Sequence, residues 1–279
     1  MKNLFKVFCI LAVSALICSL ESCDKVNQKK NSENNNFMPS PDLVKIPTEL
    51  ARVMKKNFDS CPYNVLKKIV TSHPKDYYIT NEQFTNIYNN FPQTSETLKI
   101  HFIQYRKEQN YNNNYPELIP FDKQLYIVYS YAENGSIEKY HGIFNLEKDI
   151  YISQEDFEKM KNNYKEYIKK EIGRYNCIPE EEQTDYVNIK KQEIKDYLID
   201  AQKYELSNAV KGNIVKFILS TVSDTDKYKN YYQNKNDNAK PGQLTLITDT
   251  WADNNSSSRI SLLSDYDLNT LCPSNCDAK

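Results

Sequence analysis

The chain has 279 residues, and its 36 Lys and Arg nearly balance its 37 Asp and Glu, for a formal net charge of −1. This balance argues against a protein that grips nucleic acid through bulk charge. Gly occurs only 5 times, and no two glycines are spaced for a G-x-G-x-x-G fingerprint, a P-loop or a G-x-S-x-G nucleophile elbow. The sequence therefore carries none of these nucleotide-binding or hydrolase motifs.

Residues 1–22 have the pattern of a secretory signal peptide. Two lysines precede a largely apolar run over residues 7–20, which is shorter than the roughly 20 residues that a membrane span needs. No later stretch is apolar for long enough to cross a bilayer. The sequence therefore predicts an exported protein whose mature form lacks these residues.

The residues after the apolar run, Leu20-Glu21-Ser22-Cys23, resemble a bacterial lipobox, in which the cysteine becomes the acylated first residue. Glu21 departs from the commonest form of that motif. The alternative is ordinary cleavage that leaves Cys23 as a thiol. Residues 23–45, rich in Asn, Lys and Ser, are expected to form a flexible tether. The protein is thus predicted to be held at the membrane by lipid on Cys23, on the periplasmic or the surface face of the cell envelope.

Residues 46–148 are predicted to form a first α+β unit. Its leading helical segment, about residues 48–72 and interrupted at Pro62, is expected to pack on this unit. A helix then starts at Ile79-Thr80-Asn81-Glu82-Gln83-Phe84, where Thr80 and Gln83 suit a capping box and Ile79 and Phe84 a hydrophobic staple. Alternating runs at 98–105 and 124–131 predict two antiparallel strands.

Residues 149–255 are predicted to form a second, related unit. Its helix start, Ile152-Ser153-Gln154-Glu155-Asp156-Phe157, matches the first in cap and staple, and strand-like runs follow at 213–221 and 243–251. An insertion carries a further helix near 189–206. Chance similarity of two caps is the alternative. The fold class is therefore predicted to be α+β, with Phe84 and Phe157 each covering the antiparallel sheet of its own unit.

The second half, with the tail at 256–279, resembles a group of Bacteroidetes lipoproteins of uncharacterised role. The shared features are the Ile-Ser/Thr-x-Glu helix start, a middle helix, a strand-rich end and a terminal Leu-Cys-Pro-x-x-Cys, here Leu271-Cys272-Pro273-Ser274-Asn275-Cys276. Ser274 stands where that group usually has a second proline. The resemblance implies an envelope lipoprotein without a known activity, so it supplies no catalytic residue.

Four cysteines remain once Cys9 and Cys18 leave with the signal and Cys23 takes lipid. They are Cys61, Cys177, Cys272 and Cys276. An even number in an exported chain favours disulfides, and four cysteines allow three connectivities. We expect the tail pair to be oxidised. Cys-x-x-x-Cys alone supplies two of the four ligands that structural zinc usually needs, so no metal site and no cofactor are predicted.

The titratable residues form no recognisable catalytic motif. His101 lies on an alternating strand and is expected to be exposed, His141 is expected in a turn, and Glu180-Glu181-Glu182 in a solvated loop. No catalytic residue is therefore assigned. A secreted hydrolase, for example a carboxylate-based glycosidase, stays the alternative because two acids can approach in space from any spacing.

The loops that join the two strands of each unit are rich in tyrosine. The candidate binding residues are Tyr105, Tyr111 and Tyr115 in the first loop and Tyr228, Tyr231 and Tyr232 in the second. Tyr and Asn together are typical of binding surfaces, although both are enriched throughout this chain. The hypothesis is a non-catalytic binding or scaffolding module that uses exposed tyrosines to contact a protein or a glycan, and not nucleic acid.

Overall fold

The structure is a computed structural model that describes residues 46–131, 139–208, 213–223, 226–228, 231, 239–252, 260–266 and 270–273. The chain divides after Met38 into two units, and the described residues all belong to the second. The predicted signal peptide, Cys23, the tether, Tyr232 and Cys276 lie outside the described residues. Among the helices of the described part, none is both long and apolar enough to cross a membrane.

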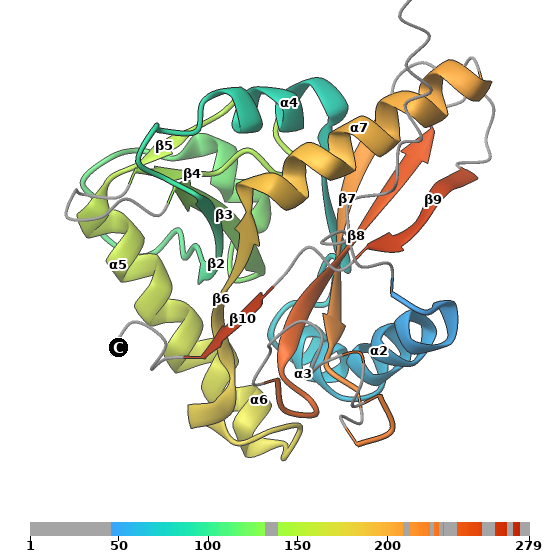
Figure 1. Cartoon of the computed structure of the whole chain (residues 1–279). Helices are drawn as coiled ribbons and strands as arrows, with labels where there is room; N and C mark the ends of the chain where they lie inside the picture. The colour runs from blue at the N-terminus through green and yellow to red at the C-terminus, as the bar shows by residue number, and fades with distance from the viewer. Residues whose placement is uncertain are drawn as a thin grey trace, which may run out of the picture. The chain divides into compact units, whose positions relative to one another are not determined.

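Helices and antiparallel sheets make up the fold, which confirms the predicted α+β class (Figure 1). The α-helices are α2 (Thr48–Ser60), α3 (Pro62–Ile69), α4 (Asn81–Asn89), α5 (Gln154–Asn163), α6 (Lys170–Arg174) and α7 (Lys191–Asn208). Shorter helical segments are the 3-10 turns η1 (Pro116–Phe121) and η3 (Glu180–Glu182) and the π-helix η2 (Tyr164–Lys169). Pro62 stands at the first turn of α3, where a missing N–H costs no hydrogen bond.

The strands form two sheets. They are β1 (Asp76–Thr80), β2 (Thr97–Gln104), β3 (Leu125–Tyr131), β4 (Tyr140–His141), β5 (Tyr151–Ile152), β6 (Thr184–Lys190), β7 (Asn213–Thr221), β8 (Leu244–Ala252), β9 (Ile260–Tyr266) and β10 (Thr270–Pro273). The four-stranded sheet has the order β1-β7-β8-β9, and the six-stranded sheet has the order β10-β6-β2-β3-β4-β5. The predicted hairpins β2–β3 and β7–β8 are both present.

The two halves of the chain exchange strands, so the predicted boundary between residues 148 and 149 does not separate two packed units. β1 from the first half pairs with β7, where Ile79 faces Val215. β6 from the second half pairs with β2, where Ile189 faces Leu98. β6 was not predicted from the sequence. Ile189 was expected in the helix near 189–206, but it lies on β6, and α7 begins at Lys191. Each sheet therefore needs strands from both halves.

In each sheet the exchanged strand pairs with one strand of a hairpin. Val215 continues opposite Thr250 of β8, and Leu98 continues opposite Tyr131 of β3. Two units with the element order strand, helix, hairpin therefore correspond: β1-α4-β2-β3 and β6-α7-β7-β8. In this order of elements α7 takes the position of α4, whereas the matching caps paired α4 with α5. The predicted repeat and a common origin of the two units stay predictions.

The helices cover the sheets differently from the prediction. Phe84 of α4 contacts Phe217 of β7, with ring centroids 5.9 Å apart, so it covers the four-stranded sheet. Phe157 of α5 lies 5.0 Å from His101 of β2, so it covers the six-stranded sheet. The leading helix α2 packs mainly on β7, a strand of the second half. The expected pairing of each capped helix with the sheet of its own half is therefore wrong for both phenylalanines.

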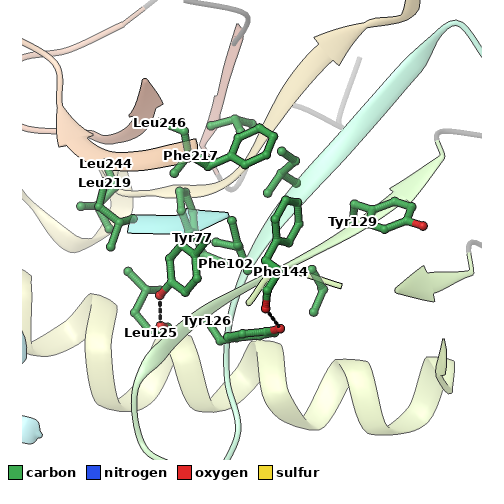
Figure 2. Packing of buried hydrophobic residues seen from close by; sticks show 14 of the residues in the cluster. Tyr77, Phe102, Leu125, Tyr126, Tyr129, Phe144, Phe217, Leu219, Leu244 and Leu246 are labelled. Carbon is green, nitrogen blue, oxygen red and sulfur yellow. Dashed lines mark hydrogen bonds between the residues drawn. The ribbon is translucent and has the colours of Figure 1, made fainter. Parts of the chain in front are cut away.

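The two sheets share one hydrophobic core (Figure 2). The Tyr77 hydroxyl of β1 donates a hydrogen bond to the carbonyl of Leu125, and its ring meets Tyr126 edge to face at 5.7 Å. Phe144, between β4 and β5, meets Phe217 at 5.0 Å. Buried aromatic pairs of this kind are worth about 0.5–1.5 kcal/mol beyond the area that they bury. Contacts between the sheets therefore hold the exchanged strands in one body.

Candidate functional site

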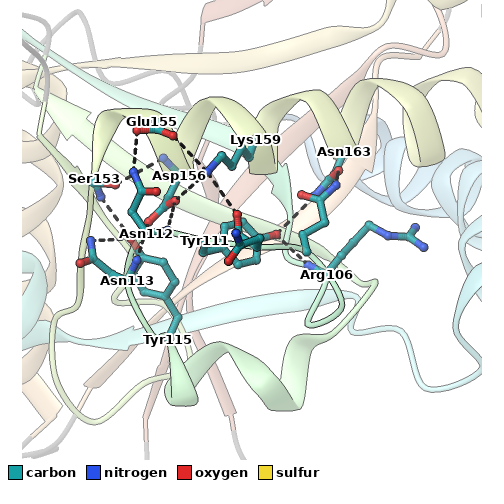
Figure 3. Close-up of polar contacts among 12 residues, drawn as sticks. Arg106, Tyr111, Asn112, Asn113, Tyr115, Ser153, Glu155, Asp156, Lys159 and Asn163 are labelled. Atoms are coloured by element: carbon teal, nitrogen blue, oxygen red, sulfur yellow. Dashed lines mark hydrogen bonds and ion pairs between the residues drawn. The ribbon is translucent and has the colours of Figure 1, made fainter.

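The candidate site is the tyrosine loop, residues 105–124, which joins β2 and β3 and lies against α5 (Figure 3). Its anchor is the carboxylate of Asp156, which is 0% exposed. This carboxylate accepts hydrogen bonds from the backbone N–H groups of Asn112 (2.8 Å) and Asn113 (3.1 Å) and from the Tyr115 hydroxyl (2.8 Å). One side chain of α5 thus fixes the tip of the loop.

These hydrogen-bond donors stabilise the charged form of the Asp156 carboxyl group. Burial raises the pKa of the carboxyl group, but the hydrogen bonds from Asn112, Tyr115 and Asn113 outweigh that effect and hold the pKa below its ordinary value. The Tyr115 hydroxyl also accepts from the N–H of Ser153 at 3.3 Å. Tyr115 therefore takes the place that the third helical residue occupies in a capping box, and Asp156 is released to hold the loop.

Tyr111 is the centre of a second set of contacts. Its ring stacks on Tyr105 with centroids 5.2 Å apart and an interplanar angle of 18°. Its hydroxyl accepts hydrogen bonds from the backbone N–H of Arg106 (3.1 Å) and from the side-chain amide of Asn163 (3.4 Å). Burial raises the pKa of Tyr111 to about 12. The phenol therefore stays neutral and holds the start of the loop against the end of α5.

The expected rim of exposed tyrosines is wrong for the residues that the structure describes. Tyr105, Tyr115 and Tyr231 are 6%, 4% and 9% exposed, and Tyr111 and Tyr228 are half-buried. The hydroxyls of Tyr111 and Tyr115 make hydrogen bonds within the protein. The exposed side chains at the loop tip are instead the amides of Asn110, Asn112, Asn113 and Asn114. Alternation along the sequence gave no sign that α5 would cover this loop.

The structure joins Cys61 to Cys177 in a disulfide, with Cα atoms 5.7 Å apart. The bond links the start of α3 to the segment before η3, across 116 residues of sequence. This pairing excludes a disulfide from Cys61 or Cys177 to either cysteine of the tail. The backbone of Cys272 pairs with Tyr186 of β6, and oxidation of the tail pair stays a prediction. Within the described ranges, no group of three or more metal-binding side chains is found.

His101 is buried, contrary to the prediction. Its Nε2 lies 2.8 Å from the Ser130 hydroxyl, and its ring packs among Tyr140, Phe157 and Tyr186. Both faces of the middle of β2 are covered, because α5 lies over the face that alternation predicted to be solvated. Burial lowers the pKa of His101 well below its ordinary value. The residue is therefore a neutral part of the core.

His73, which belongs to no motif of the sequence, fixes the other end of the tyrosine loop. Its Nδ1 donates to the carbonyl of Pro74 at 2.8 Å, and its Nε2 accepts from the N–H of Leu125 at 2.7 Å. This arrangement needs the neutral ring with the proton on Nδ1. Burial accordingly lowers the pKa of His73 to about 4. The loop is thus held by a carboxylate at its tip and by a neutral imidazole at its end.

Two further polar pairs lie outside any motif of the sequence. His141 lies on β4, not in a turn, and its Nδ1 is 2.6 Å from Asp149, while its ring stacks on Tyr129. Lys169, at the end of the π-helix η2, lies 2.7 Å from Asp185 of β6, and both side chains are buried. Spacing in the sequence could not have indicated either pair, because each is made by the pairing of strands or by helix packing.

Comparison with protein-family models, with curated proteins and with solved structures finds no match to this chain. The likeness to the Bacteroidetes lipoproteins therefore stays a prediction that depends on the motifs quoted above. The function of the protein is therefore inferred from its own sequence and structure.

Proposed function

We propose that the protein is an exported lipoprotein of the bacterial cell envelope whose folded body is a non-catalytic binding module. The observation that carries the proposal is the Cys61–Cys177 disulfide, because disulfides persist in oxidising compartments and are rare in the cytosol. It agrees with the export that residues 1–22 predict. Cys23, the residue that would carry the lipid, follows this segment directly.

Support for a binding role comes from the tyrosine loop. Asp156 holds the backbone of Asn112 and Asn113, and the side chains of both residues are exposed. A loop that is already ordered loses less conformational entropy when it binds a partner. Amide side chains donate and accept hydrogen bonds, which suits the polar groups of a protein or a glycan. Two of the three histidines, His73 and His101, serve the packing of the body and are not available for acid–base chemistry.

The anchor is tested by replacing Cys23. Cys23→Ala in the full chain should abolish the incorporation of labelled palmitate and should move the protein from the membrane fraction to the soluble fraction. Cys18→Ala is the matched control, because Cys18 is a nearby cysteine that lies in the apolar run before the lipobox, and its replacement should leave both measurements unchanged. If the Cys23→Ala variant still incorporated palmitate and stayed in the membrane fraction, the proposal of a lipoprotein anchored at Cys23 would be excluded.

A hydrolase is the second candidate, and the His141–Asp149 pair is the observation that favours it. Asp149 bonds Nδ1, which leaves Nε2 available to accept a proton, as in a general base oriented by a carboxylate. His141→Ala should then abolish turnover of activated esters or of aryl glycosides by the purified full chain. The absence of turnover by the unmodified protein across such a panel, or turnover that His141→Ala leaves unchanged, would rule out this role.

A further inference from the structure

A groove lies between α4 and α7. It has a volume of about 430 Å³, within the range of about 300–1,000 Å³ that is typical of small-molecule sites. Figure 1 shows α4 and α7 side by side above the strands. The residues that line the groove are Asn81, Thr85, Tyr88, Asn89, Lys195, Leu198, Ile199 and Gln202.

The groove is built by corresponding positions of the two units. Counted from the first residue of each helix, Thr85 corresponds to Lys195, Tyr88 to Leu198 and Asn89 to Ile199. The groove therefore lies where the two strand–helix–hairpin units meet, and junctions between packed units are frequent positions for ligand sites. The two units supply different chemistry at these matched positions, because α4 contributes mostly polar groups and α7 contributes two aliphatic side chains.

The lining combines hydrogen-bonding groups with apolar surface. Asn89 and Gln202 are amides, and each amide can donate to one hydroxyl while it accepts from a neighbouring one. Tyr88, Leu198 and Ile199 offer apolar area for the C–H face of a sugar ring. Lys195 adds a positive charge, and the lining contains no carboxylate. Such a site favours a ligand with many hydroxyl groups and tolerates or attracts a negative charge.

We propose that the α4–α7 groove binds a glycan, with a preference for sugar units that carry a carboxylate. This inference depends on the binding role proposed above, but not on the lipid anchor or on the tyrosine loop. The groove would bind the glycan without cleaving it, because glycoside hydrolysis uses a pair of carboxylic acids and the lining has none. The preference for acidic sugars is assigned to Lys195.

The test is isothermal titration of the full chain, in detergent, with neutral oligosaccharides and with matching oligosaccharides that contain glucuronate or galacturonate. Asn89→Ala and Gln202→Ala should each weaken binding, and the double variant should weaken it by roughly tenfold or more, since each lost hydrogen bond contributes about 0.5–1.5 kcal/mol. Lys195→Gln should remove the preference for the acidic sugars and should leave the binding of the neutral ones in place.

Matched controls are available on the same two helices. Asn86 of α4 and Gln192 of α7 are exposed amides that do not line the groove. Asn86→Ala and Gln192→Ala should leave binding unchanged, and circular dichroism should show that all variants are folded.

Three results would overturn the inference. They are no binding of any of these sugars at millimolar concentration, equal losses in the groove and control variants, and a Lys195→Gln variant that keeps the full preference for the acidic sugars. The first two would remove the glycan site and the third its acidic preference, and all three would leave the binding role of the tyrosine loop in place. If the unmodified chain incorporated no palmitate, by contrast, the proposed lipid anchor would be excluded and the proposed glycan site in the groove would not be affected.

Discussion

The starts of α4 and α5 have the same cap chemistry in sequence and different roles in the structure. At α4, Thr80 and Gln83 complete a capping box, with hydrogen bonds of 3.1 and 2.8 Å, and the helix end is satisfied locally. At α5, Ser153 accepts from the N–H of Asp156, but the Asp156 carboxylate holds the tyrosine loop instead of reaching back. A cap motif therefore predicts where a helix begins, and not what its third residue contacts.

The largest expected effect concerns the hydrophobic staples of the two helix starts, in which Phe84 and Phe157 hold matching positions. Phe84→Ala and Phe157→Ala should each lower the free energy of unfolding by about 3–5 kcal/mol, because both rings are fully buried against a sheet. Urea unfolding of the purified chain measures both. If one variant were as stable as the unmodified protein, that phenylalanine would not lie in the core.

The second effect depends on pH and concerns His73, which holds the end of the tyrosine loop. The pKa of His73 is about 4 in the folded protein, below its ordinary value of 6.5, so the folded state binds fewer protons between these values. The contribution of neutral His73 is complete above pH 6.5 and is lost as the pH falls toward 4, by about 3 kcal/mol. His101 acts with the same sign.

Urea unfolding at pH 7, 5.5 and 4 measures this dependence. His73→Ala should be less stable at pH 7 and should lose less of its stability between pH 7 and pH 4 than the unmodified chain does. An unchanged slope in the variant would show that His73 is not a neutral acceptor for Leu125.

The third effect separates the two helix starts directly. Asp156→Ala should destabilise the protein by about 2–3 kcal/mol, because two backbone N–H groups and a phenol lose a charged acceptor. Gln83→Ala, at the matching position of α4, should cost about 1 kcal/mol or less. Hydrogen exchange at Asn112 and Asn113 should increase only in the Asp156 variant. Equal costs at the two positions would contradict the different roles assigned to them.

The smallest effect concerns the half-buried Tyr111. Tyr111→Phe keeps the stack on Tyr105 and removes the acceptor for Arg106 and Asn163, so it should cost about 1 kcal/mol. Tyr167→Phe is the control, because Tyr167 is 44% exposed and should change stability by less than about 0.5 kcal/mol. Thermal unfolding of the two variants side by side distinguishes them.

The helix caps, the helix break and the hairpins could be predicted from the sequence, and the pairing of strands from the two halves could not. The cap at Thr80, the break at Pro62 and the hairpins β2–β3 and β7–β8 follow from neighbouring residues, and the structure has all of them. The exchange of β1 and β6 joins residues 85 or more positions apart, such as Ile189 and Leu98, and no periodicity carries that information. The burial of His101 and Tyr115 follows from the place of α5, which the matching caps assigned to the wrong sheet.

The most direct test of the proposed function is mass spectrometry of the mature protein, isolated from bacterial membranes without a reducing agent. The account predicts an N-terminal peptide that begins at Cys23 and carries acyl chains, together with a peptide pair joined through Cys61 and Cys177. Peptides from residues 1–22 in the mature protein, an unmodified Cys23, or free thiols at both Cys61 and Cys177 would contradict it.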